Sequence, residues 1–165
     1  MVLNNFAKTV AGGIYTGSGN SVTYINESGN SWTYGYSFIE ALRTPRARNS
    51  YGGSADQGVT VVLGAGDTAA TPNDYALSND ITTNLTYLSG IASPAGDGVI
   101  TSITQTYQNS TGAAVTIKEI GLLVGVGYNW QSGGFILMTR KVLDAPVTIP
   151  DGKTYSFNIT IALNN

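Results

Sequence analysis

The residues with the clearest potential for chemistry lie in the segment VTVVLGAGDTAAT, residues 59–71. Within it, Gly64-Ala65-Gly66-Asp67-Thr68-Ala69 follows a β-branched run and matches the G-x-G-x-x-A pattern of a dinucleotide-binding turn. Such a turn needs a helix that begins within the glycines, so that the first backbone amides face a pyrophosphate. A nicotinamide or flavin site is therefore the first hypothesis to weigh.

Pro72 argues against that site. A helix beginning near Gly66 would carry this proline in its second turn, where it removes a hydrogen bond and costs about 3 kcal/mol. The capping signals instead place the start at Thr71, because Pro72 suits the first helical position and Asp74 resembles the end of a capping box. The sequence thus predicts a tight glycine turn and then one short helix near residues 72–80. Helical spacing could prolong it through Leu77, Ile81, Leu85 and Leu88.

Histidine and cysteine are both absent from the 165 residues. Their absence removes the Ser-His triad, the Cys nucleophile and the zinc-thiolate site, which lowers the expectation of an enzyme. Calcium bound through Asp67, Asp74 or Asp80 is an alternative, although no EF-hand spacing joins these residues. The sequence favours a protein that is not an enzyme and that holds no cofactor and no metal.

Glu119 is the carboxylate with the most unusual surroundings, because it lies between apolar residues in VTIKEIGL. A carboxylate there is either exposed by strand alternation or buried and paired. Arg140 follows the apolar run FILMT and could supply the opposite charge. No motif marks a second carboxylate, so we predict a structural Glu119–Arg140 pair rather than catalysis. Such a pair specifies register more than it adds stability.

The elements that must position these residues are strands. Charged residues make up 11% of the chain, against about 25% in a typical domain, so Ser, Thr, Asn and Gly provide most of the polar surface. Turn chemistry at Pro150-Asp151-Gly152 separates runs too closely spaced for parallel crossovers. The sequence therefore predicts an all-β fold, an antiparallel β-sandwich or jelly-roll-like arrangement. Its β-like, alternating or apolar runs cover residues 99–108, 113–118, 120–126, 135–138 and 154–163.

The pattern divides the chain at residue 58. Residues 59–165 form the predicted β-sandwich module, whereas residues 1–58 are less regular and read as an arm with one or two strands, 22–26 and 32–39. We expect this arm to form interfaces. The candidate contact residues are the arginines Arg43, Arg46 and Arg48 and the aromatics Trp32, Tyr34 and Tyr36. With Tyr24, Tyr128 and Trp130, these aromatics could alternatively form a sugar-stacking platform.

The net charge of −2 does not suggest binding to nucleic acid or to an anionic membrane. No run of about 18 apolar residues occurs, so we expect no transmembrane helix, and the N-terminus has no signal-peptide pattern. A weakly charged surface rich in Thr and Asn suits packing against other protein copies.

Two segments together resemble proteins of tailed-bacteriophage virions. Residues 61–68 and 71–77, VVLGAGDT and TPNDYAL, are similar to a "GxGxTxxTPxDxxL" signature in those proteins. Residues 117–123, 137–143 and 146–149, with Gly152, are similar to their "EIGL … LxxR … PVTxxxG" pattern. The matching segments span residues 59–163, about two thirds of the chain, and their order and spacing carry the likeness.

The resemblance implies a non-enzymatic, β-rich virion structural protein. It would assemble as an oligomer on the capsid, neck or tail, as a decoration, head-fibre or tail accessory component. Its partners would be further copies of itself and other virion proteins. A carbohydrate-binding or receptor-adhesion module is the alternative, which would make a glycan the ligand.

Overall fold

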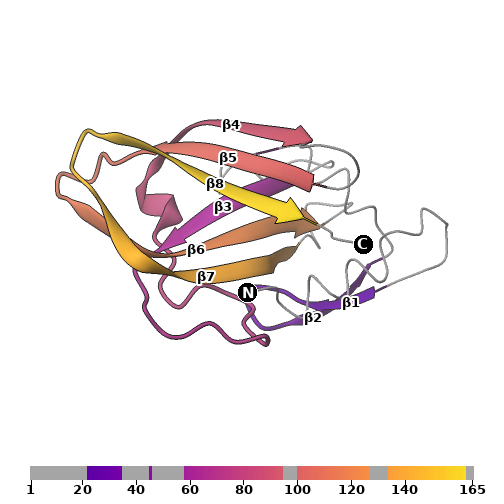
Figure 1. The fold of residues 1–165 in the computed structure, drawn as a ribbon. Coiled ribbons are helices and arrows are strands. Elements are labelled where there is room, and N and C mark those ends of the chain that lie inside the picture. Colours follow the sequence, from indigo (N-terminus) through magenta and orange to yellow (C-terminus); the bar gives the residue numbers. More distant parts are fainter. Residues whose placement is uncertain (1–21, 35–44, 46–57, 95–99, 127–133, 163–165) are drawn as a thin grey trace.

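The structure is a computed structural model, and it describes residues 22–34, 45, 58–94, 100–126 and 134–162. Two three-stranded antiparallel sheets face each other (Figure 1). The first sheet has the order β3-β6-β7, with β3 Gly58–Gly64, β6 Val115–Val126 and β7 Gly134–Ile149. The second has the order β4-β5-β8, with β4 Thr86–Pro94, β5 Ile100–Gln108 and β8 Thr154–Ala162. These two sheets confirm the predicted all-β, antiparallel fold class.

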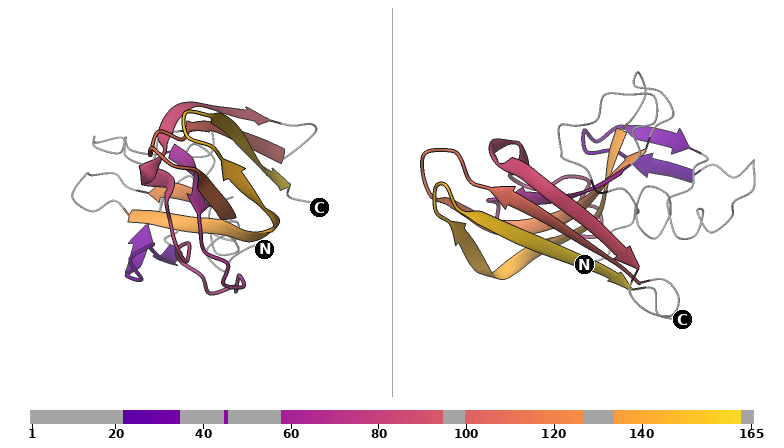
Figure 2. Two further views of the ribbon diagram at one scale, coloured as in Figure 1. Left: turned by 90° about the vertical axis from the view of Figure 1, so that its left-hand side faces the viewer. Right: turned by 90° about the horizontal axis from the view of Figure 1, so that it is seen from above.

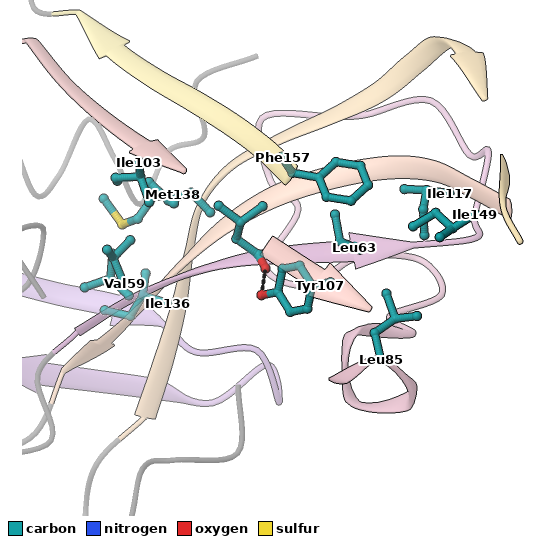
Figure 3. Packing of buried hydrophobic residues seen from close by; sticks show 13 residues of the cluster. Val59, Leu63, Leu85, Ile103, Tyr107, Ile117, Ile136, Met138, Ile149 and Phe157 are labelled. Carbon is teal, nitrogen blue, oxygen red and sulfur yellow. Dashed lines mark hydrogen bonds between the residues drawn. The ribbon is translucent and has the colours of Figure 1, made fainter. Parts of the chain in front are cut away.

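The main core lies between the two sheets (Figure 3). Alternation along each strand directs one set of apolar side chains inward, as expected for a sheet with one face against a partner sheet. Tyr107 is the largest fully buried side chain, and its hydroxyl donates to the Val61 carbonyl oxygen over 2.6 Å. The buried apolar members are Val59, Val61, Leu63, Leu85, Ile103, Tyr107, Ile117, Leu122, Val124, Ile136, Met138, Ile149 and Phe157.

The prediction of a short helix over residues 72–80 is wrong. In the described ranges, the one helical element is a 3-10 turn at Thr82–Asn84. Only half of the predicted capping box forms: Asp74 Oδ2 accepts from the Thr71 N–H over 2.9 Å, whereas the Asp74 N–H donates to the Thr71 carbonyl oxygen over 3.2 Å and not to the Thr71 hydroxyl. These bonds close a single turn. No helix follows: the amides of Ser78 and Asn79 instead donate to the carboxylate of Glu119.

The helical spacing from Leu77 to Leu88 is likewise a coincidence. Leu85 belongs to the core between the sheets, whereas Leu88 lies in strand β4 and is exposed. Strand β4 is not among the predicted strands. The threonines at 82, 83 and 86 nevertheless argued against a helix there, because β-branched residues are poor helix formers.

Side chains of β5 and of the 3-10 turn cover the free edge of strand β3. Gln105 accepts from the Val61 N–H over 2.7 Å and donates to the Val59 carbonyl oxygen over 3.1 Å. Thr82 similarly accepts from the Leu63 N–H over 2.8 Å. These bonds pair backbone groups that an edge strand would otherwise expose to another chain, and they tie the two sheets together.

Within the predicted N-terminal arm, the described residues form a hairpin of β1 Val22–Ile25 and β2 Ser31–Tyr34. Asn26 shapes its turn, because its side-chain oxygen accepts from the Asn30 N–H over 2.8 Å. The Glu27 N–H donates to the Phe135 carbonyl oxygen over 2.9 Å, which attaches the hairpin to β7. Pro45 forms an isolated parallel bridge with Val59.

Candidate functional site

A long loop, residues 65–81, crosses the outer face of the first sheet; we call it the strap. In two views it runs along β6 and β7 on the side away from the second sheet (Figures 1 and 2). Leu77 of the strap packs in a small apolar cluster with Val62, Leu123 and Leu137, with Phe135 at its margin. Both faces of the first sheet are therefore covered, one by the second sheet and one by the strap.

Glu119 and Arg140 meet beneath the strap. Arg140 Nε donates to Glu119 Oε2 over 2.7 Å, and the two side chains are 2% and 0% exposed. The other guanidinium nitrogens of Arg140 reach the strap: Nη1 pairs with Asp74 Oδ2 over 2.5 Å, and Nη2 donates to the Thr68 carbonyl oxygen over 2.8 Å. The structure thus places the two predicted partners together and adds Asp74 as a third charged member.

The strap backbone surrounds the Glu119 carboxylate with donors. Oε1 accepts from the Asn79 N–H over 2.9 Å, from the Gly66 N–H over 3.2 Å and from Ser78 Oγ over 3.1 Å. Oε2 accepts from the Ser78 N–H over 3.3 Å besides its bond to Arg140. Buried charges persist in proteins when they are paired and fully hydrogen-bonded, and this carboxylate meets both conditions.

The glycines of the G-x-G pattern allow this close approach. A Cβ atom on Gly64 would lie 2.5 Å from Glu119 Cγ, and a Cβ atom on Gly66 would lie 2.6 Å from Glu119 Oε1. The glycine-rich turn therefore does bind an anion, but the anion is a carboxylate of the same chain, 53 residues from Gly66. This explains the dinucleotide-like spacing without a cofactor.

Two register shifts between β6 and β7 turn Glu119 and Arg140 to the strap side. Ile117 faces the core, so strict alternation would also direct Glu119 inward, but the register shifts between these two residues. A second shift, at Leu122/Leu123 on β6, makes Met138 the extra residue on β7 and pairs Arg140 with Gly121. The first shift sets one residue of β6 opposite four of β7, and the second adds one residue to β7. Because side chains alternate with a period of two, an odd number of extra residues exchanges the faces of a strand, so each shift places one member of the pair.

The cluster keeps all three groups ionised. Burial works to raise the pKa of Glu119, but the Asn79 and Ser78 amides and Arg140 outweigh it and hold this pKa below its usual value. Burial likewise works to raise the pKa of Asp74, yet Thr71 and Arg140 lower it. The two carboxylates raise the pKa of Arg140, against the opposing effect of burial.

This arrangement suits a structural role better than an acid–base one. Glu119 is fully buried, and its oxygens already accept bonds from the strap and from Arg140. A general base needs a lone pair within reach of its substrate. What the cluster does chemically is fasten residues 65–81 to the sheet through charge-assisted hydrogen bonds.

The three aspartates considered as calcium ligands have separate partners. Asp67 pairs with Lys118 over 3.0 Å at the surface, Asp74 pairs with Arg140, and Asp80 accepts from the Thr82 N–H over 2.8 Å. Lys118 lowers the pKa of Asp67. Within the described ranges, no group of three or more acidic side chains is placed to hold a metal ion.

The predicted interface residues fall mostly outside the described part of the chain. Trp32 and Tyr34 belong to β2, where their backbones pair with Tyr24 and Val22, but their side chains are not described. Tyr36, Arg43, Arg46 and Arg48, together with Tyr128 and Trp130, lie outside the described residues.

Sequence reasoning missed the strap as a binding partner of Glu119. The sequence carries two motifs that bear on this contact, the G-x-G turn and the Thr71–Asp74 capping pair. Both motifs contact the same ion pair, because the Gly66 N–H donates to Glu119 and Asp74 accepts from Arg140.

Comparison with known protein families found no match, and neither a similar curated protein nor a similar solved structure was found. Over the residues that the structure describes, no helix has the length and apolar character needed to cross a membrane.

Proposed function

We propose that this chain is a structural protein of a tailed-bacteriophage virion, assembling as an oligomer on the capsid, neck or tail. One observation supports this proposal most directly. The two segments that carry the resemblance meet in a single cluster, in which the Gly66 amide and Asp74 from the first segment bind Glu119 and Arg140 from the second.

The contacts give the residues of the resemblance a structural meaning. Gly64 and Gly66 admit the Glu119 carboxylate, and Asp74 neutralises Arg140. Gly121 makes room for Leu77, since a Cβ atom there would lie 3.0 Å from that side chain. A signature made of residues that bind one another marks a building module rather than a substrate site, which agrees with a virion component.

The surface composition also supports assembly. Charged residues make up only 11% of the chain, and the exposed positions of β8 are hydroxyl and amide side chains. Such a surface can be covered by another protein without burying unpaired charges.

Purified particles from the source of this sequence provide the test. Gradient-purified virions, analysed by quantitative mass spectrometry and by immunogold electron microscopy, should contain the chain in several copies at one location on the particle. Absence from washed particles would overturn the proposal. A glycan array with the purified chain tests the alternative, and specific glycan binding by a chain absent from particles would favour the adhesion module.

A further inference from the structure

The outer face of the second sheet is a flat array of uncharged polar side chains; we call it the hydroxyl face. The register aligns three rows across β4, β5 and β8, with Thr106 opposite Ser156, Thr104 opposite Asn158 and Ser102 opposite Thr160. Strand β4 continues these rows with Ser89, Ile91 and Ser93. None of these nine residues is ionisable, although strands on a protein surface ordinarily carry charges.

The polar groups of the hydroxyl face bind one another. Thr106 Oγ1 and Ser156 Oγ are 2.9 Å apart, and Asn158 Nδ2 donates to Ser102 Oγ over 2.6 Å and to Thr104 Oγ1 over 2.8 Å. Thr160 Oγ1 completes the array by donating to Asn158 Oδ1 over 3.1 Å. Because these groups already have partners within the sheet, removing water from the face costs less than burying unpaired polar groups.

Ile91 adds apolar area to this face. It lies in the middle row opposite Thr104 and is 64% exposed, the most exposed of the large apolar side chains in the described ranges. Leu88, at the irregularity in β4, is 49% exposed. Depletion of charged residues is typical of the centre of a protein–protein interface, and the two exposed apolar side chains add area that such a contact would bury.

The absence of charge restricts the possible occupants. In a two-fold contact the same patch of both copies meets, so a face of one charge sign would repel its copy, whereas the nine residues of this face carry no charge. A strongly charged partner would instead lose water from its own charges without gaining an opposite charge. We therefore propose that the hydroxyl face binds the hydroxyl face of a second copy of this chain, a contact that rests on the self-assembly in the proposed function.

Charge insertion tests the contact. We expect multi-angle light scattering to give the wild type a mass of at least twice 17.2 kDa. Ile91→Glu and Ser156→Lys should each weaken self-association by about tenfold or more, because each variant brings two like, unpaired charges into one contact. The matched control is Thr148→Lys in β7, since Thr148 forms an equivalent pair with Thr116 on the first sheet and is exposed. It should leave the mass unchanged.

Cross-linking gives a second readout. The chain has no cysteine, so Ile91→Cys introduces a single thiol, which a short bis-maleimide should join into covalent dimers, whereas Thr148→Cys should remain monomeric on denaturing gels. A monomeric wild type, or face variants that still assemble, would overturn the contact. If the chain is present in virions but its assembly is unaffected by Ile91→Glu, the proposed contact is wrong and the proposed function stands. Assembly through this face by a chain absent from virions would defeat only the proposed function. Circular dichroism confirms that each variant is folded.

Discussion

The Gly66 N–H donates to the carboxylate of Glu119 over 3.2 Å and joins two segments that lie 53 residues apart. This contact relates a glycine-rich turn to a buried ion pair and fastens the strap to the first sheet.

Gly66→Ala should destabilise the protein by about 2–4 kcal/mol, because the added methyl group would overlap the Ser78 hydroxyl and crowd Glu119 Oε1, which disrupts the hydrogen bonds of both groups. Urea denaturation measures the change. Gly112→Ala is the matched control: that glycine has a φ of +84° and open space around it, so alanine there should cost only about 1 kcal/mol. Equal losses at the two positions would contradict a close approach at Gly66.

Replacing either partner of the ion pair should be costly. Arg140→Met should lower the free energy of unfolding by about 3–5 kcal/mol, because it leaves the buried Glu119 carboxylate without its cation. Glu119→Gln should cost less, because Asp74 still pairs with Arg140. The double variant should lose clearly less than the sum of the single losses. Additive losses in this double-mutant cycle would mean that the two side chains are not coupled.

Acid should loosen the strap. The folded-state pKa values of Glu119 and Asp74 lie below their ordinary values of about 4, so both groups contribute stability above that pH and lose it as the pH falls through the folded-state values. Hydrogen exchange should therefore rise first in residues 65–81 as the pH drops below about 4.

Asp74→Asn should make the stability of the protein less dependent on pH in that range, because one of the two titrating groups is removed. Asp144→Asn is the control, since Asp144 is 93% exposed and pairs with the surface residue Lys141. An Asp74→Asn variant whose acid profile matches that of the wild type would exclude Asp74 from the effect.

Gln105→Leu should both destabilise and promote aggregation. The variant leaves the Val61 N–H and the Val59 carbonyl oxygen without their side-chain partner, at about 1–3 kcal/mol for each unpaired group. It also reopens the edge of β3 to other strands. Denaturant titration and light scattering on heating measure the two effects, and Tyr107→Phe, which removes one donor to Val61, should have the smaller effect.

Local pattern was enough to identify most strands of the module, but not β4. Residues 154–163 alternate without error, and β8 covers Thr154–Ala162. The same approach failed between residues 72 and 88, because Thr71, Asp74 and the leucines satisfy the rules for a helix only as long as no distant group competes for the amides. Glu119 is that group, and its sequence position does not reveal that it takes the amides of Ser78 and Asn79.

The sequence by itself determined the all-β class, and it marked Glu119 and Arg140 as opposite charges inside apolar runs. Only the tertiary structure decided that they face the strap, because two register shifts between β6 and β7 exchange the faces that strict alternation would assign to them. Alternation is a property of one strand, whereas register is a property of a pair of strands. The meaning of the G-x-G turn depended on this same register, since the anion that the turn binds comes from the neighbouring strand.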